Sequence, residues 1–365
     1  MSDTGGGHRA SAQAIEEAIE FLYPGRYQTI IEDVWSRHMP WPIRLMPDTY
    51  GWITGPGRPL WAMLWKLTSC RSLQTAMFGA FSPMVQSSVA RYIRSVQPDL
   101  CVSVHPLMNH LGLKWIEHAG LSIPFITVVT DMVSLHPSWI CPGVDRCLVS
   151  TEEAKKRAIL YGMPPEKIGV HGQPVGLKFT RLDGDKNKYK SLLGLDPDRP
   201  AVLLVGGGEG YGQLYGIARK LAATTNQGQL VVVAGRNRKL KKKLEQVCWQ
   251  IPTKIFGFVD NMPELMAAAD VLITKAGPGT ISEAFVAGLP PILSGHIPGQ
   301  ETGNIHYVRK NRAGAYARSG TKIAHTVQQW LDSTHPVLEE LAHNAACLAR
   351  PNASIDIASD ICSFL

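Results

Sequence analysis

Short, nearly continuous apolar runs constrain the fold of this chain more than any other feature. Five lie in its second half: "AVLLVGGG", "LVVVAG", "TKIFGFV", "DVLITKAG" and "LPPILSG". Runs without polar alternation are typical of parallel strands that helices cover on both faces. The first half carries four more candidates, "YQTIIEDV", "PDLCVSVHP", "PFITVVTD" and "RCLVS", and helical periodicity separates the runs. We therefore predict an α/β protein with two doubly wound halves that face a cleft.

A segment rich in glycine, charge and turn-forming residues separates the two sets of runs. It reads "GQPVGLKFTRLDGDKNKYK" and indicates a linker. Its position predicts an N-terminal domain over residues 1–175 and a C-terminal domain over residues 176–345, and a chain of 365 residues suffices for both. We expect residues 346–365 to form a C-terminal helix that packs back on the N-terminal domain.

Charge and cysteine content narrow the choice of partners. Lys and Arg number 37 against 30 Asp and Glu, so the net charge of +7 suits a nucleotide, an acidic membrane surface or nucleic acid. The basic run "RNRKLKKKLEQ" has no aromatic stacking platform, so we expect no nucleic-acid partner. Seven scattered cysteines without a CxxC pair favour a reducing compartment. No apolar stretch approaches the roughly 20 residues that span a bilayer, so we expect membrane contact to be peripheral.

Residues 35–71 interrupt the alternation of strands and helices. They contain five of the nine tryptophans, including Trp61 and Trp65, and five Arg or Lys residues, with Asp48 as the only acid. Tryptophan favours the boundary between water and lipid, and basic side chains can meet lipid phosphates. The stretch "PLWAMLWKL" reads as a short amphipathic helix. A membrane-docking insertion, an inter-domain lid and a buried insertion all fit this pattern.

Two glycine loops in the second half lie where a strand meets a helix. In "LLVGGGEGYG" and "ITKAGPGTISEA", backbone N–H groups at the helix start can approach a phosphate. Thr280 can cap the second helix and donate to a phosphate oxygen, and Glu283 can accept from two ribose hydroxyls. A capping box between Thr280 and Glu283 is the alternative. In "PGQETGN", Gln300 and Glu301 could hold sugar hydroxyls or simply begin a helix.

A third glycine run opens the chain, where His8 follows "MSDTGGG" at the start of a helical pattern. The positive end of a helix dipole opposes a charged imidazolium, so His8 would stay neutral and able to accept a proton. A hydrogen bond to phosphate and a solvent-facing loop position are the alternatives. Asp131 ends the run "PFITVVTD" and could act as a rival base or orient His8.

Taken in order, these motifs resemble the monogalactosyldiacylglycerol synthase family. The chain carries "SDTGGGHRASAQAI", "TDMVSLHPSW", "GQPV", "GGGEGYG", "GRN", "GFV", "KAGPGTISEA", "GLP" and "PGQETGN", and the resemblance runs from Ser2 to about residue 318. It implies a GT-B glycosyltransferase with two Rossmann-like domains. Family members place an apolar strand directly before the first motif. We therefore expect that strand, the first of the N-terminal domain, to be missing from a chain that starts at residue 1.

The resemblance implies the inverting transfer of a hexose, with galactose favoured, from a UDP-sugar to the hydroxyl of 1,2-diacylglycerol, without a metal or cofactor. His8 would be the base, and Asp131 its rival or its orienting partner. His136, Trp139, Trp61 and Trp65 would face the acceptor or the membrane. The donor-binding residues would be Gly207, Gly208, Glu209, Arg236, Phe258, Val259, Lys275, Gly277, Pro278, Gly279, Thr280, Glu283, Gln300 and Glu301.

The partners implied are a UDP-hexose, diacylglycerol and anionic membrane lipids, at the cytoplasmic face of a plastid-type or bacterial membrane, and a homodimer is allowed. A UDP-glucose-dependent diacylglycerol glucosyltransferase is an alternative. So are a UDP-N-acetylglucosamine 2-epimerase and a non-catalytic lipid-binding homologue. The Trp-rich residues 35–71 count against an epimerase, because that reaction needs no lipid surface.

Overall fold

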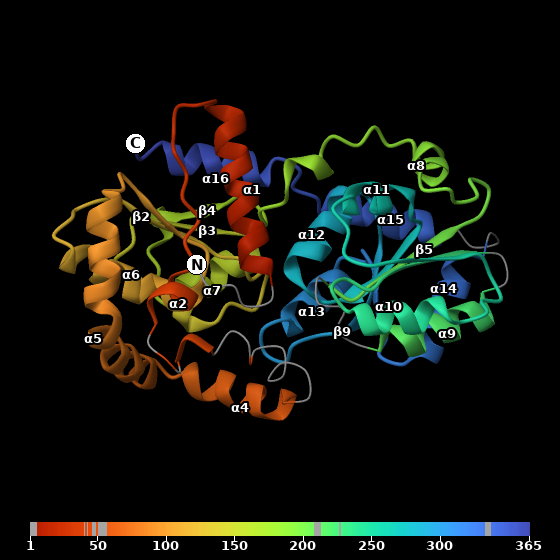
Figure 1. Ribbon diagram of the computed structural model, residues 1–365, viewed down its shortest axis with the longest axis horizontal. Coiled ribbons are helices and arrows are strands. Elements are labelled where there is room, and N and C mark those ends of the chain that lie inside the picture. Colours follow the sequence, from red (N-terminus) through yellow and green to blue (C-terminus); the bar gives the residue numbers. More distant parts are fainter. Residues whose placement is uncertain are drawn as a thin grey trace. The chain divides into compact units, whose positions relative to one another are not determined.

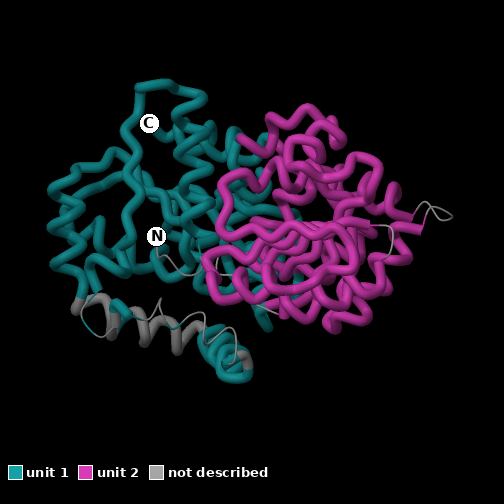
Figure 2. Tube along the Cα trace, turned by 45° about the vertical axis from the view of Figure 1, so that its right-hand side comes forward, with its two compact units in different colours: residues 1–177, 297–303, 352–365 teal, residues 178–296, 304–351 magenta. Residues whose placement is uncertain are grey.

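The computed structural model describes residues 6–39, 41, 43–45, 49, 57–207, 213–225, 228–332 and 337–365. The chain forms two compact units (Figure 2). Unit 1 comprises Met1–Leu177, Ile297–Gly303 and Asn352–Leu365, and unit 2 comprises Lys178–His296 and Asn304–Pro351. The short segment Ile297–Gly303, here called the 297–303 loop, thus belongs with unit 1 although its sequence neighbours lie in unit 2.

Unit 1 is built on a parallel sheet (Figure 1). The described strands follow the order β1 (Cys101–Ser103), β2 (Phe125–Val128), β3 (Arg146–Val149) and β4 (Ile168–Val170). In β2, Ile126 and Val128 point to one face and Phe125 to the other, as the two-residue period of a strand requires. Both faces are buried, which explains why the sequence of β2 shows no polar alternation.

Helices cover each face of the unit 1 sheet. On the face of Ile126 lie α1 (Gly7–Leu22) and α16 (Ala353–Cys362), which pack against each other. The opposite face carries α6 (Pro106–His118) and α7 (Glu152–Leu160). The other helices among the described residues of this unit are α2 (Val34–His38), η1 (Ile43–Leu45), α4 (Arg58–Thr68), α5 (Arg71–Val96), η2 (Pro137–Trp139) and η3 (Pro165–Lys167).

The strand expected at "YQTIIEDV" is wrong. Residues 27–33 are not paired with any described strand, and Asp33 instead caps α2, where its Oδ1 accepts from the backbone N–H of Ser36 at 3.1 Å. Thr29 donates its hydroxyl to Glu16 of α1 at 2.7 Å. A β-branched sequence becomes a strand only where a neighbouring strand completes its hydrogen-bond ladder.

Unit 2 contains a second parallel sheet, in the order β10-β9-β8-β5-β6-β7. The chain builds outward from β5 through β6 and β7, then crosses to the other side of β5 with β8, β9 and β10. Doubly wound sheets bind ligands where the strand order reverses, at the carboxyl ends of the strands, which here are the ends of β5 and β8. The strands are β5 (Ala201–Val205), β6 (Gln229–Val233), β7 (Thr253–Phe256), β8 (Val271–Lys275), β9 (Pro291–Gly295) and β10 (Ala315–Tyr316).

The core of unit 2 joins the sheet to α9 (Leu214–Thr224) and α14 (Gly320–Trp330), which pack together. The other helices described wholly within this unit are α8 (Lys186–Leu192), α10 (Arg238–Glu245), α11 (Met262–Ala268), α12 (Pro278–Val286) and α15 (Val337–Cys347). The short helix η4 (Leu177–Phe179) begins at the last residue of the first segment of unit 1, and α13 (Thr302–Lys310) begins in the 297–303 loop. The two parallel, helix-covered sheets confirm the predicted α/β class. Among the described residues, no helix combines the length and apolar character needed to span a bilayer.

Candidate active site

The first turn of α1 places His8 at the carboxyl edge of the unit 1 sheet. Gly6 precedes the helix with φ +79°, in the left-handed region that favours glycine, and no side chain caps the helix. The Nδ1 atom of His8 lies 3.0 Å from the hydroxyl of Thr130, which follows β2. If Nδ1 carries the proton and donates it to Thr130, the other ring nitrogen, Nε2, is an acceptor.

Two further buried rings surround His8. The His105 ring meets it edge-on, with centroids 4.6 Å apart, and the Trp139 ring lies at 6.2 Å. His105 caps α6, where its Nδ1 accepts from the backbone N–H of Leu107 at 3.3 Å. Burial, followed by the nearby His8, lowers the pKa of His105 well below its usual value. A neutral His105 places no positive charge beside His8.

Asp131 is buried and accepts two hydrogen bonds, neither of them from His8. The indole N–H of Trp139 donates to its Oδ2 at 2.7 Å, and Nε2 of Gln300 donates to its Oδ1 at 3.2 Å. Burial raises the pKa of Asp131 to about 6, while these two hydrogen bonds oppose the rise. In this structure Asp131 therefore orients Trp139 and Gln300, and Thr130 contacts Nδ1 of His8.

The 297–303 loop turns its two candidate sugar ligands in different directions. Gln300 reaches Asp131, whereas Glu301 is 2% exposed and folds back to accept the backbone N–H of Ile297 at 2.7 Å. The backbone N–H of Gly303 donates to Ser134 at 2.8 Å. Glu301 thus shapes the loop in this conformation, and Gln300 is the member of the pair that contacts Asp131.

In unit 2, the glycine loop after β8 leads directly into α12. Gly277 is the N-cap, Pro278 is the first helical residue, and no side chain caps the helix. The expected capping role of Thr280 is wrong, because the helix begins two residues before it. The capping box with Glu283 is excluded for the same reason. The first-turn N–H groups of Gly279 and Thr280 remain suited to bind an anion.

Glu283 lies one turn further along α12 and is half-buried. Burial raises the pKa of Glu283 to about 7, and the ammonium group of Lys178 lowers it in part. Lys178 is held by a 2.7 Å hydrogen bond from its Nζ to the backbone carbonyl of Asp260. Such a carboxyl changes charge near neutral pH, which is unusual for a structural surface acid and typical of a binding site.

Other predicted donor residues surround the same edge of the unit 2 sheet. Gly207 follows β5 with φ +72°, and a Cβ atom added there would lie 4.0 Å from Cε of Lys275, at the end of β8. The guanidinium of Arg236 stacks over the exposed ring of Phe258 at 4.6 Å, and Val259 follows it half-buried. Gly208 and Glu209 lie outside the described residues.

Two of the four residues expected to face acceptor or membrane are buried. Trp139 is 0% exposed and His136 is 6% exposed. Burial lowers the pKa of His136 to about 4, so its ring is neutral at physiological pH. Trp61 and Trp65 are half-buried on α4. Trp139 and His136 therefore support the interior of unit 1 and do not form a membrane surface.

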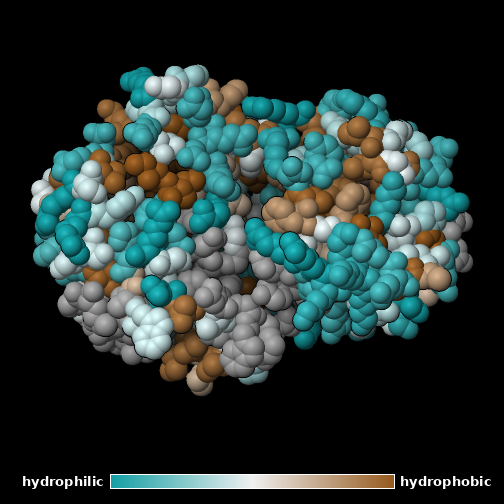
Figure 3. Space-filling model, viewed as in Figure 1, coloured by the Kyte–Doolittle hydropathy of each residue, from teal (hydrophilic) through white to brown (hydrophobic). Residues whose placement is uncertain are grey.

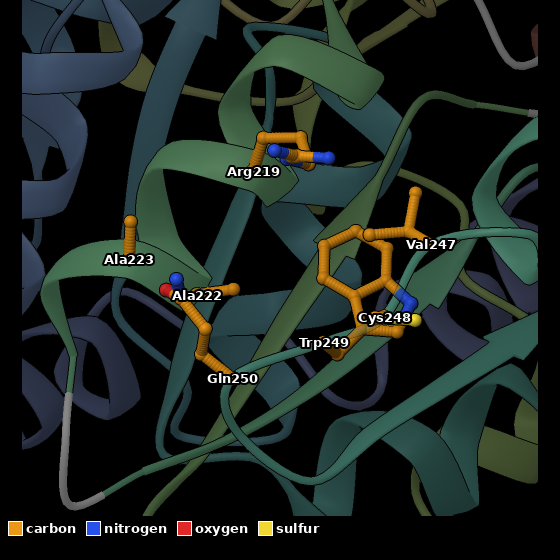
Figure 4. A pocket seen from close by; sticks show the side chains of 7 residues that line it. All are labelled: Arg219, Ala222, Ala223, Val247, Cys248, Trp249 and Gln250. Carbon is orange, nitrogen blue, oxygen red and sulfur yellow. The ribbon is translucent and has the colours of Figure 1, made fainter.

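A small cavity in unit 2 is separate from this site (Figure 4). It lies between the C-terminal half of α9 and the segment before β7, and its lining includes Arg219 and Trp249. These segments meet the amino edge of the parallel sheet, whereas the glycine loops leave its carboxyl edge. The cavity therefore plays no part in the candidate site.

Family models match both units of the chain. Residues 8–175 match the monogalactosyldiacylglycerol (MGDG) synthase model, and residues 201–352 match the glycosyltransferase family 28 C-terminal domain. The monogalactosyldiacylglycerol synthase of Spinacia oleracea is 44% identical over 99% of this chain and 71% of its own length. The chain belongs to the monogalactosyldiacylglycerol synthase family. Monogalactosyldiacylglycerol synthase 1 of Arabidopsis thaliana is 41% identical over 99% of this chain and 69% of its own.

Solved structures share the fold of this family member at low sequence identity. The MurG of Acinetobacter baumannii has a TM-score of 0.56 at 16% identity and covers 76% of this chain and 77% of its own. The S. aureus MnaA–UDP co-structure has a TM-score of 0.60 at 14% identity and covers 78% and 80%. These likenesses show the expected GT-B fold and carry no information on substrate.

Sequence reasoning missed several residues of the site. Thr130 stands directly before Asp131, and His105 lies between a predicted strand and a proline. Nothing in the sequence indicated that both residues contact His8. Asn304 ends the motif "PGQETGN"; its Nδ2 donates to the carbonyl of Ala276 at 2.9 Å and fixes the glycine loop before α12. Lys178 lay in the expected linker and gave no signal.

Proposed function

We propose that this protein transfers galactose from UDP-galactose to the hydroxyl of 1,2-diacylglycerol and so makes monogalactosyldiacylglycerol. The observation that carries the proposal is 44% identity to a named synthase over 99% of the chain. The geometry of both units supports it. Unit 1 offers a histidine at a helix start whose Nδ1 contacts Thr130, and unit 2 offers an uncapped helix start beside a carboxyl of raised pKa.

The donor would bind at the carboxyl edge of the unit 2 sheet. The diphosphate would accept from the first-turn N–H groups of α12 at Gly279 and Thr280, and Lys275 would add positive charge. Glu283 would accept from the two ribose hydroxyls, and the ring of Phe258 with Arg236 would border the uracil. The positive end of α12 and Lys275 would neutralise the departing UDP, so the proposed transfer needs no metal.

The acceptor step would use His8 as general base. Nε2 of His8 takes the proton as the diacylglycerol oxygen attacks the anomeric carbon from the face opposite UDP. A new carbon–oxygen bond forms, the bond from the anomeric carbon to the phosphate oxygen breaks, and its electron pair leaves on UDP. Thr130 supports this assignment because a bond from Nδ1–H to its hydroxyl leaves Nε2 as the acceptor. Gln300 would carry the hexose contact.

Diacylglycerol resides in a lipid layer, so the proposal requires a membrane surface. We assign the membrane-binding surface of the protein to α4, whose Leu60, Met63, Leu64 and Leu67 are exposed at helical spacing. Figure 3 shows apolar side chains gathered over this helix. Attachment would be peripheral, at a plastid-type or bacterial membrane, and anionic lipids would favour it. A homodimer stays a further prediction.

The test is incubation of the protein with labelled UDP-galactose or UDP-glucose and diacylglycerol vesicles, followed by lipid extraction and mass spectrometry. We expect monogalactosyldiacylglycerol, a preference for UDP-galactose, and an unchanged rate in a metal chelator. A glucolipid would replace the donor assignment. Epimerised nucleotide, or no reaction at all, would contradict the proposal.

A further inference from the structure

Helix α4 presents two different faces. Its outer face carries the apolar stripe Leu60, Met63, Leu64 and Leu67, which is 37–52% exposed. Its inner face carries Trp61, Trp65 and Thr68, and none of the side chains described in α4 is fully buried. A helix with so little burial is held only weakly by the protein, so a surface that covered the outer face would add much of its stability.

The inner face of α4 touches the 297–303 loop and the segment before η2. Trp65 packs edge-on against His136 at 4.6 Å, and the hydroxyl of Thr68 lies 3.2 Å from Nε2 of the same histidine. Trp65 also lies directly on Gly299, where an added Cβ atom would come within 2.6 Å of the indole Cδ1. Only a residue without a side chain permits this approach, and Gly299 also has φ +84°.

Gly299 immediately precedes Gln300, which donates to Asp131 at 3.2 Å. On its other side the loop is fixed by the 2.8 Å hydrogen bond from Gly303 to Ser134. Asp131 in turn accepts from Trp139, whose ring lies beside His8. A continuous set of contacts therefore links the apolar helix α4 to the residues around the proposed base.

We propose that Trp65 is a positioning residue that couples the contact of α4 with a lipid surface to the placement of Gln300 for the hexose of the donor. This inference rests on the proposed function, because it takes Gln300 as a hexose ligand. When lipid covers the outer face, α4 is stabilised with its indole on Gly299. The loop is then held in the conformation that presents Gln300, and the donor binds more tightly.

The occupant of the outer face is a lipid surface on two grounds. Leu60, Met63, Leu64 and Leu67 form one apolar stripe along a single helix, which suits shallow insertion below lipid headgroups. The described side chains of α4 include exposed Lys66 and no acid, and the chain carries a net charge of +7, so an anionic surface attracts it.

The experiment compares the dissociation constants of UDP-galactose and UDP, measured by calorimetry with and without vesicles. The vesicles contain phosphatidylcholine and an anionic phospholipid but no diacylglycerol, so no transfer occurs. For the unmodified protein we expect vesicles to tighten UDP-galactose binding about tenfold and UDP binding hardly at all, because only the hexose meets the loop. Trp65→Ala should abolish this selective effect while vesicle flotation persists, and Trp65→Phe should restore part of it.

A matched variant tests the outer face of α4 without changing its inner face. Leu64→Ser/Leu67→Ser should lose flotation and the vesicle effect but keep both dissociation constants measured without vesicles. The inference would be overturned if vesicles tightened UDP-galactose binding equally in Trp65→Ala and in the unmodified protein. It would also be overturned if vesicles tightened the binding of UDP and of UDP-galactose to the unmodified protein equally. Self-association without vesicles that Leu64→Ser/Leu67→Ser abolishes would overturn it as well, because the outer face of α4 would then bind a second copy of the chain. Failure of the unmodified protein to bind either nucleotide would instead refute the proposed function.

Discussion

Glu283 provides the sharpest test at the scale of single residues, because its raised pKa of about 7 predicts a pH dependence. Only the ionised carboxylate accepts from both ribose hydroxyls, so UDP binding should weaken as the pH falls through 7, by about tenfold per unit once the group is protonated. Glu283→Gln should weaken UDP binding about 10–100-fold at pH 8, the loss expected for hydrogen bonds to a charged group.

Calorimetric titration with UDP between pH 6 and 8 measures this dependence. The diphosphate of UDP also changes its protonation with pH, whichever variant binds it. The readout is therefore the difference between the unmodified protein and Glu283→Gln in the slope of UDP affinity against pH. Glu245→Gln is the matched control, because that carboxylate pairs with Lys241 at the surface of unit 2. Parallel pH profiles for Glu283→Gln and the unmodified protein would remove Glu283 from the ribose site.

Thr130 provides a second residue-scale prediction, through its 3.0 Å contact with Nδ1 of His8. Thr130→Val keeps the shape of the side chain but removes the acceptor that selects the useful tautomer of His8. We expect kcat to fall about tenfold to a hundredfold, as general-base catalysis is worth at least that much, while KM for UDP-galactose changes little. Thr130→Ser should recover most of the rate. A rise in KM with unchanged kcat would place Thr130 in binding instead.

At the scale of elements, α16 is tied to the unit 1 sheet by one carboxylate. Asp360 accepts from Nε of Arg146 at 3.0 Å and from Nη2 of Arg146 at 2.8 Å, and Nε2 of His171 lies 2.8 Å away. Burial alone would raise the pKa of Asp360, but these partners hold it below its usual value. The stabilisation is therefore present above pH about 4 and is lost as the pH falls further.

Asp360→Asn should loosen α16 and its neighbour α1 at pH 7. We expect a loss of about 1–3 kcal/mol, because the carboxylate accepts charge-assisted hydrogen bonds while remaining partly exposed to water. Hydrogen exchange of both helices would measure it. Asp356→Asn, on the exposed side of the same helix, is the control. Equal protection of α1 and α16 in Asp360→Asn and the control would show that apolar packing alone holds them.

The apolar runs predicted β5 to β9 and β1 to β3, because strands buried on both faces leave a clear mark in the sequence. The same reasoning missed β4 and β10, which are only three and two residues long. It also predicted a strand at residues 27–34, where apolar β-branched residues find no strand partner among the described residues. Local sequence indicates how readily a segment forms a strand, but not whether a neighbouring strand is present to pair with it.

At the scale of the whole molecule, the sequence identified the fold and the family but not the contacts that define the site. Thr130 and His8 are 122 residues apart, and Gln300 and Asp131 are 169 apart. Side-chain pairs at such separations follow from packing, which no local pattern records. The raised pKa of Glu283 likewise arises from burial, and it is lowered in part by Lys178, a residue in the expected linker. The roles assigned to His8, Asp131 and the donor residues stay predictions.

The most direct measurement is a crystal structure of the protein soaked with UDP. We expect the diphosphate at the first turn of α12, next to the backbone N–H groups of Gly279 and Thr280, and the ribose hydroxyls on Glu283. Well-ordered UDP bound anywhere else on the protein would contradict it.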